Sequence, residues 1–316
     1  MAKVAIMRRT GKPKDSKHQG IWKVHAGNII EEVFQGIEDG IKAAGDTPVI
    51  YDDKFIIPQE NNVVIFGYGR REDNNPKHWL QNWKHSIITK VEARGGKVFC
   101  WDGGFFKSLR NFKYFRFGMN SPLRNGVFLN ENSTPDRWNM LQKEFNIPYN
   151  MDRRSGNRVL ILAQPFEGFS MNMVKMTDIF ERPVTLFQKL GKQVQIKPHP
   201  NTKRAEYDEI SKFCDTKKIT LIPKETPLYE TFDDVCLTVT FNSTVAVESA
   251  LYGIPTIAMD SLSHAYPVCH NNVNNAVSNY EIFDRNQWIH DLSHTMWSAN
   301  ELATGELWNR FKEYNA

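Results

Sequence analysis

The sequence predicts an α/β protein built from two doubly wound halves, and three observations support this fold class. Short apolar runs alternate with helix-like stretches along both halves, which is typical of parallel strands joined by crossover helices. These runs are continuous instead of alternating with polar residues, as expected for strands that are covered on both faces. At 316 residues and 41% hydrophobic residues, the chain is long enough for two domains with a core each.

Residues 1–150 are predicted to form the first domain. Its expected strands cover residues 3–7, 47–53, 62–69 and 96–104, and its expected helices cover 27–45 and 76–94. The first of these helices is amphipathic and ends at a glycine. We therefore expect a parallel sheet with helices on its faces.

A polar stretch with two prolines, residues 130–157, interrupts this pattern and marks the domain boundary near residue 150. The second domain, residues 151–300, has expected strands at 158–164, 193–196, 219–223, 235–240 and 255–259, and expected helices at 171–190, at 203–214 and from about 243. Residues 301–316 end in an amphipathic helix. Ligands of open α/β sheets bind at the carboxyl ends of the strands, so we expect a cleft there.

Composition excludes several classes of protein. No segment approaches the ~18 to 20 apolar residues of a membrane span, and the first residues lack the apolar run of a signal peptide, so the sequence predicts a cytoplasmic protein without a membrane span. The four cysteines lack CxxC spacing, which favours free thiols. His264, Cys269 and His270 lie close together but have no fourth ligand, so we expect no metal site.

The charge is unevenly distributed along the chain. Residues 1–150 carry 23 Lys+Arg and 16 Asp+Glu, a net charge of +7, whereas residues 151–316 carry 17 and 20, a net charge of −3. A basic first half attracts polyanions such as nucleic acid, acidic glycans and membrane surfaces. An ordinary scatter of surface charges is the alternative explanation.

The stretch "QVQIKPHPN", residues 193–201, places Lys197 and His199 each before a proline. Proline disfavours helical conformation in the residue before it, so this segment is predicted to run extended and rigid after its strand. The stretch alone leaves three interpretations open: a hydrogen-bonded core histidine, a surface turn, or a ligand-binding histidine at a strand end.

The stretch "TVTFNSTVAVESALYGIPTI", residues 238–257, predicts a strand followed by a helix that begins after Asn242 and Ser243. Backbone amides, the hydroxyls of Ser243 and Thr244 and the positive end of a helix dipole together favour an anion, and the pattern predicts a phosphate site. Glu248 lies one turn beyond Thr244 and could accept hydrogen bonds from ribose hydroxyls. A plain capped helix is the alternative.

These two stretches together resemble the HP and Ser/Thr motifs of GT-B glycosyltransferases, in particular the capsule polysaccharide synthesis family and its Kdo-transferase and bacterial sialyltransferase relatives. Two further stretches resemble the same family: "WDGGFFKSLRNFKYFRFGMNS" (101–121) and "LILAQPFEGFSMN" (160–172). The resemblance implies a GT-B fold, in which two Rossmann-like doubly wound domains face a central cleft. It also implies a nucleotide-sugar donor, a UDP-sugar or CMP-sugar, and a C-terminal helix, residues 301–316, that crosses back to the first domain. No metal is required, because Lys197 and His199 can compensate the phosphate charge and the sequence has no DxD motif.

The resemblance assigns roles to single residues. It implies that His199, Ser243 and Thr244 bind the donor phosphates and that Asp102 is the carboxylate that deprotonates the acceptor hydroxyl. The donor-binding set is Gln164, Lys197, His199, Asn242, Ser243, Thr244 and Glu248. A turn-forming aspartate before Gly103 is the alternative for Asp102. The chain departs from the family at Phe106, Lys107 and Ser108, where an Arg-Pro pair is usual.

The acceptor is expected on the basic first domain, with Arg8, Arg9, Arg70, Arg71 and Lys107 as candidate ligands. A 5-hydroxymethylpyrimidine base in DNA is the favoured acceptor, as for the DNA-base glycosyltransferases of bacteriophages, and would place the protein in the cytoplasm of a bacterial host. A capsule or lipopolysaccharide precursor is the second possibility. A non-catalytic protein that binds nucleotides or nucleic acid also stays open, because fold alone does not imply a reaction.

Overall fold

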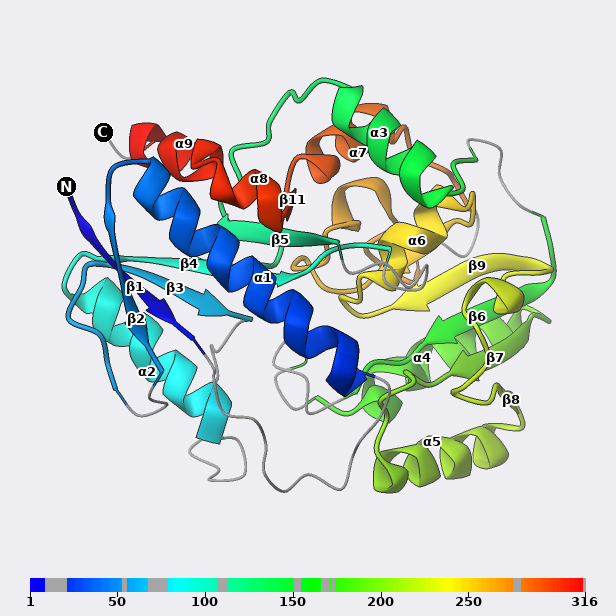
Figure 1. Cartoon of the computed structure of the whole chain (residues 1–316). Helices are drawn as coiled ribbons and strands as arrows, with labels where there is room; N and C mark the ends of the chain where they lie inside the picture. The colour runs from blue at the N-terminus through cyan, green and yellow to red at the C-terminus, as the bar shows by residue number, and fades with distance from the viewer. Residues whose placement is uncertain are drawn as a thin grey trace. The chain divides into compact units, whose positions relative to one another are not determined.

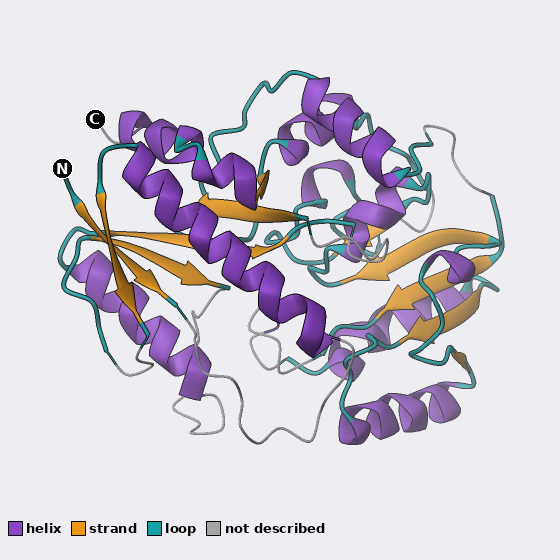
Figure 2. Ribbon diagram, viewed as in Figure 1, coloured by secondary structure: helices purple, strands orange, loops and turns teal. Residues whose placement is uncertain are grey.

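The computed structural model describes residues 1–8, 22–52, 56–67, 79–106, 113–150, 155–165, 171, 174–274 and 280–314 (Figures 1 and 2). The chain forms two compact units. Unit 1 comprises Met1–Ser133 and Asp291–Ala316, and unit 2 comprises Thr134–His290. The boundary between them therefore lies at Ser133, whereas the sequence pattern placed it near residue 150, and the chain returns to unit 1 at its end.

Unit 1 contains a six-stranded mixed sheet with the strand order β11-β5-β4-β3-β1-β2. β1 pairs in parallel with β2 and β3, and β3 pairs in parallel with β4; β5 is antiparallel to both of its neighbours, β4 and β11. The strands are β1 (Lys3–Met7), β2 (Thr47–Tyr51), β3 (Asn62–Phe66), β4 (Lys97–Gly103), β5 (Tyr114–Met119) and β11 (Met296–Ser298). The C-terminal segment thus supplies an edge strand of this sheet.

The faces of this sheet are covered by helices from both ends of the chain. Side chains of α1 (Trp22–Ala43), α8 (Ala299–Ala303) and α9 (Glu306–Tyr314) pack with strand residues in one apolar cluster, whose largest rings include Trp101 and Trp308. α2 (Trp79–Ala93) lies on the opposite face (Figure 1). Burial on both faces explains why the strand sequences read as continuous apolar runs.

Unit 2 contains a five-stranded parallel sheet with the strand order β10-β9-β6-β7-β8. The strands are β6 (Arg158–Leu162), β7 (Gln193–Lys197), β8 (Thr220–Leu221), β9 (Val235–Thr240) and β10 (Thr256–Ala258). From β6 the chain builds outward through β7 and β8, and then returns to the other side of β6 for β9 and β10. The order therefore reverses between β6 and β9, which is the topological switch point of the sheet.

The connections of unit 2 carry its helices. They are α3 (Asp136–Phe145), α4 (Met176–Lys189), α5 (Arg204–Lys217), α6 (Val245–Leu251) and the first part of α7 (Asn286–Ser293), with short 3₁₀ turns η4 (Tyr229–Thr231) and η5 (Tyr266–Val268). α4 and α5 pack on one face of the sheet around Phe180, Phe187 and Ile196. Val245 at the start of α6 and Tyr252 directly after it pack on the other face against Leu160 and Leu162.

The structure confirms the predicted α/β class with parallel sheets in two Rossmann-like units. It adds β5 and β11, which are antiparallel and which the sequence pattern did not identify. All six residues of β5 are buried, including Arg116, so neither face of this strand is exposed to solvent. Within the described residues, no helix has both the length and the apolar character needed to cross a bilayer.

Candidate functional site

The predicted donor residues of unit 2 lie at the carboxyl edge of its parallel sheet. Gln164 follows β6, His199 follows β7 and Asn242 follows β9; Asp260, which was not among the predicted residues, follows β10 at the same edge. Because Gln164 and Asn242 come from the two strands that flank the switch point, they occupy the position where open α/β sheets bind ligands.

Three of these side chains are joined in a chain of hydrogen bonds, which we call the amide chain: Gln164, Asn242 and Asp260. Gln164 Nε2 donates to Asn242 Oδ1 at 2.9 Å, and the backbone N–H of Asn242 donates to Gln164 Oε1 at 2.9 Å. Asn242 Nδ2 donates to Asp260 Oδ2 at 2.7 Å. Gln164 is 9% exposed and Asn242 is 5% exposed, so the two bonds between them are shielded from water and hold their geometry.

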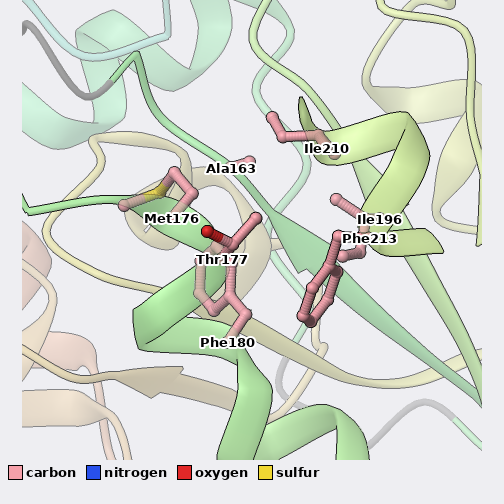
Figure 3. Close-up of a pocket in the computed structure, with 7 residues that line it drawn as sticks. All are labelled: Ala163, Met176, Thr177, Phe180, Ile196, Ile210 and Phe213. Atoms are coloured by element: carbon pink, nitrogen blue, oxygen red, sulfur yellow. The ribbon is translucent and has the colours of Figure 1, made fainter. Parts of the chain in front are cut away.

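The side chains that pack beside Gln164 of the amide chain are mostly apolar. Figure 3 shows a pocket lined by Ala163, Met176, Thr177, Phe180, Ile196, Ile210 and Phe213, which come from β7, α4, α5 and, for Ala163, the position directly after β6. The single hydroxyl in this lining, that of Thr177, bonds to Glu209. The backbone N–H of Gln164 donates to the sulfur of Met176 at 3.2 Å. The pocket is therefore part of the core that holds Gln164 in place, and its chemistry does not suit a polar ligand.

Lys197 is the last residue of β7, and it is 5% exposed. Its ammonium donates to the backbone carbonyl of Lys224 at 3.2 Å. Burial lowers the pKa of Lys197, and the negative charge of Glu225 opposes this shift. A buried cation at a strand end can compensate a phosphate charge, but this ammonium already has a carbonyl partner within the unit.

His199 lies between two prolines in a turn that its own groups close. The backbone N–H of Asn201 donates to His199 Nδ1 at 3.0 Å, and the N–H of Thr202 donates to the carbonyl of His199. Because Nδ1 accepts a hydrogen bond, the neutral ring carries its proton on Nε2. The turn therefore fixes a donor tautomer that suits an anionic ligand.

The segment after β9 begins α6 at Val245, with Ser243 and Thr244 immediately before it. Ser243 Oγ accepts a hydrogen bond from the N–H of Val245 at 3.3 Å, while Thr244 makes no side-chain cap. α6 has seven residues, so its dipole is short. Glu248 is buried, and its contact with a ribose stays a prediction.

In unit 1, Asp102 lies on β4 directly opposite Arg116 of β5. Arg116 Nη2 contacts Asp102 Oδ2 at 3.3 Å, Arg116 Nε donates to the carbonyl of Gly103 at 2.9 Å, and the N–H of Gly103 donates to Asp102 Oδ1 at 2.7 Å. The Asp102 side chain is 20% exposed, while that of Arg116 is 3% exposed and lies over the ring of Phe105. Burial lowers the pKa of Arg116, and the charge of Asp102 opposes the shift.

This geometry changes the interpretation of both residues. Asp102 is partly accessible, as a general base must be, but it is also the counter-ion of a buried guanidinium. Arg116, for which the sequence analysis named no role, is inside the unit. The base assignment of Asp102 stays a prediction, and Arg116 joins it as a partner that sequence reasoning missed.

Most of the predicted acceptor ligands lie outside the described residues: Arg9, Arg70, Arg71 and Lys107. Arg8 is described, and its Nη2 forms an ion pair with Glu31 at 2.5 Å, so part of its charge is already compensated.

The difference in net charge is also smaller between the two observed units than between the two halves of the sequence. Unit 1 carries 23 Lys+Arg and 18 Asp+Glu, a net of +5, and unit 2 carries 17 and 18, a net of −1.

The cluster of His264, Cys269 and His270 has structural contacts. His270 Nε2 accepts a hydrogen bond from the N–H of Glu281 at 3.2 Å, and burial strongly raises the pKa of the Cys269 thiol, while the charge of Arg285 opposes the shift. Within the described residues, no group of three or more His, Cys, Asp or Glu side chains is arranged to hold a metal ion.

Comparisons with known proteins show the fold. No protein-family model and no curated protein sequence matches the chain. A solved structure of KpsC from Thermosulfurimonas dismutans, a beta Kdo 2,4 transferase, is similar over 92% of this chain and 90% of its own, with a TM-score of 0.51 and 12% identity. The chain has a GT-B-like fold.

Two other solved structures are similar to this GT-B-like chain with lower scores. A KpsC structure from the same organism, a beta Kdo 2,7 transferase, matches over 98% of this chain and 100% of its own, with a TM-score of 0.42 and 13% identity. The UDP-GlcNAc 2-epimerase of Methanocaldococcus jannaschii, solved in complex with UDP-GlcNAc and UDP, matches over 99% of each chain, with a TM-score of 0.35 and 12% identity. At these identities the likeness concerns the fold alone.

Sequence reasoning identified Gln164 and Asn242 but missed Asp260, which closes the amide chain. The available signal was its position: Asp260 follows the strand "PTIAM" at the same sheet edge as the other two. Polar residues directly after each strand of a parallel sheet are brought together by the topology, and this rule would have found it.

Proposed function

We propose that the chain is a glycosyltransferase that uses a nucleotide sugar as donor and a hydroxyl group as acceptor. The observation that carries the proposal is the set of polar side chains at the switch point of unit 2, where hydrogen bonds join Gln164, Asn242 and Asp260. His199 follows β7, the strand next to β6. The GT-B-like fold supports the proposal.

In the proposed reaction, Asp102 accepts the proton of the acceptor hydroxyl. The hydroxyl oxygen forms a bond to the anomeric carbon of the sugar, and the bond from that carbon to the phosphate oxygen breaks. The electron pair leaves with the nucleotide phosphate, whose growing charge His199, Lys197 and the hydroxyls before α6 stabilise. No step requires a metal, because cationic and neutral donors compensate the phosphate charge.

The donor assignment is tested by calorimetry with UDP, CMP and their sugars. His199→Ala should weaken binding of the accepted nucleotide by about tenfold or more, because a hydrogen bond to a charged phosphate is lost. His290→Ala, a half-buried histidine on α7, is the matched control and should bind as the unchanged protein does. Equal affinity of the His199 variant would contradict the donor assignment.

The acceptor is the finer part of the proposal, and we assign it to 5-hydroxymethylpyrimidine bases in DNA. The excess of basic residues in unit 1 supports a polyanionic acceptor. The test is to incubate the protein with hydroxymethylcytosine DNA and each donor and to measure nucleoside masses. Transfer to a capsule-type saccharide without any mass gain on DNA would contradict this assignment and keep the glycosyltransferase proposal.

A further inference from the structure

The amide chain has a fixed donor and acceptor order, because both of its ends are chemically unambiguous. At one end, the backbone N–H of Asn242 can only donate, so the atom of Gln164 that faces it at 2.9 Å must be the carbonyl oxygen Oε1. At the other end, the carboxylate of Asp260 accepts, so the atom of Asn242 that faces it at 2.7 Å must be the nitrogen Nδ2.

These two constraints are consistent with the hydrogen bond between the two side-chain amides. Gln164 then presents Nε2 and Asn242 presents Oδ1, and the two atoms bond at 2.9 Å. Neither amide can turn over without setting two donors or two acceptors against each other. Since both residues are buried, such a mismatch would leave polar groups unsatisfied, at about 1–3 kcal/mol each.

Gln164 Nε2 carries a second hydrogen, and within the described residues its one recorded acceptor is Asn242 Oδ1. We propose that Asp260 is a positioning residue, which acts through Asn242 to hold the Gln164 amide so that this second hydrogen meets an acceptor oxygen of the bound nucleotide. This inference rests on the proposed function. It extends that function by stating which residue determines whether Gln164 offers a donor or an acceptor to the nucleotide.

An asparagine at position 260 could not do the same. Asp260 uses both oxygens, since Oδ2 accepts from Asn242 and Oδ1 accepts from the N–H of Leu262 at 3.0 Å. An asparagine has one oxygen for these two donors, so its nitrogen must face one of them. The mismatch either opens the turn at Leu262 or turns the amides of Asn242 and Gln164.

The experiment is a double-mutant cycle of Asp260→Asn and Asn242→Asp in the full chain. Each single change sets like groups against each other, two donors in the first and two carboxylates in the second. The double variant restores the order, because the new amide at position 260 would donate to the new carboxylate at position 242, which would also accept from Gln164 Nε2. The backbone N–H at position 242 and the turn at Leu262 keep their acceptors.

Asp284→Asn is the matched control. Asp284 is another aspartate of unit 2, and its Oδ1 accepts from the N–H of Asn286 at 3.0 Å, which is the same turn as at Asp260. An asparagine keeps that single bond. The control therefore reports the general effect of the substitution without any change in the amide chain.

Calorimetry with UDP and with CMP measures nucleotide binding by each variant of the cycle. Uridine is included because it is neutral, so its binding does not respond to the carboxylate charge that moves from position 260 to position 242. We expect each single variant to bind the accepted nucleotide about tenfold more weakly, and the double variant to bind within about threefold of the unchanged protein. Loss of uridine binding in the single variants assigns the acceptor oxygen to the base, and loss confined to the phosphorylated ligands assigns it to a phosphate.

The outcomes separate the two proposals. If the unchanged protein binds a nucleotide and the two losses simply add in the double variant, or if neither single change weakens binding, this inference is overturned and the proposed function stands. If the unchanged protein binds neither UDP nor CMP, the proposed function is overturned and this inference with it.

Discussion

The two units place different chemistry at the ends of their strands. In unit 1, Asp102 and the buried Arg116 form a charged pair, which packs against Phe105. In unit 2, two neutral amides are joined and a single carboxylate closes the chain. A charged pair that is half inside a core contributes to stability, because removing one partner leaves the other charge uncompensated. Neutral amides can lose a partner at lower cost, so the loss of a partner should destabilise unit 2 less than unit 1.

The largest expected effect comes from breaking the charged pair. Asp102→Ala should lower the free energy of unfolding by about 3 kcal/mol, at the low end for buried pairs because Asp102 is partly exposed. It should also reduce any transfer rate by about 10² to 10⁴. Asp102→Ala with Arg116→Met should recover most of the stability and none of the activity. Urea unfolding and transfer rates measure both.

The counterpart in unit 2 is Asp260→Ala, which leaves the neutral Asn242 amide behind. Its loss in free energy of unfolding should be less than half of that of Asp102→Ala. Equal losses would show that the two strand-end groups do not differ in the way described above.

The next effect concerns the C-terminal segment that only unit 1 contains. Asp46 accepts hydrogen bonds from Trp308 Nε1 at 3.0 Å and from the N–H of Ala2 at 2.8 Å, and Lys312 lies at 3.4 Å. Burial by itself raises the pKa of Asp46, but the hydrogen bonds from Trp308 and Ala2 and the charge of Lys312 outweigh it, so the net shift is downward. Asp46→Asn should lower the free energy of unfolding by about 2 kcal/mol at pH 7.

That stability difference has a defined pH dependence. A carboxylate with a lowered folded pKa stabilises the protein above its unfolded pKa of about 3.9, and this contribution is lost as the pH falls through the folded value. Unfolding curves of both proteins should therefore converge below about pH 3.9. A difference that is the same at pH 7 and pH 3 would contradict the ionic role of Asp46.

A smaller effect is expected where α1 meets α8. A Cβ at Gly36 would lie 2.3 Å from the carbonyl oxygen of Ala299, and one at Gly40 would lie 2.0 Å from that of Leu302. Alanine normally favours a helix over glycine by up to about 1 kcal/mol. We expect Gly36→Ala to lower the free energy of unfolding by about 1–3 kcal/mol instead, because α8 must move away. Glu32→Ala, on an exposed position of α1, should change it by less than about 0.5 kcal/mol.

The smallest expected effect concerns the reactivity of the cysteine thiols, which differs little between the two units. All four cysteines are buried and none forms a disulfide; one lies in unit 1 and three lie in unit 2. Burial, with a contribution from Asp215, raises the pKa of Cys214 to about 11. At pH 8 the native protein should react slowly with a thiol reagent, and all four thiols should react in denaturant. Rapid reaction of one thiol in the native state would identify a unit that opens locally.

The sequence predicted most of the fold because the parallel strands are continuous apolar runs with helices between them. It did not predict β5, whose run "YFRFGM" contains Arg116: a charged residue in an apolar stretch indicates an exposed face, and only the pairing with Asp102 shows why it is buried. β11 has three residues, which is too short for a periodic pattern.

The candidate site also contains residues that the sequence could predict and residues that it could not. Residues that directly follow long strands, Gln164, His199 and Asn242, could be predicted because parallel topology brings strand ends together. Asp260 also follows a strand, so its position was a usable signal, but its hydrogen bond to Asn242, 18 positions earlier in the sequence, could not be predicted from the sequence. Contacts of this kind come from the register of neighbouring strands.

The edge strand β11 has a consequence for how the protein is made. Its partner β5 is complete long before it, but the three residues that pair with β5 are synthesised after the whole of unit 2. On the ribosome, unit 2 has all of its strands while the sheet of unit 1 still ends at β5, with one backbone edge unpaired. All residues of unit 2 are therefore present in the nascent chain before the sheet of unit 1 has its last strand.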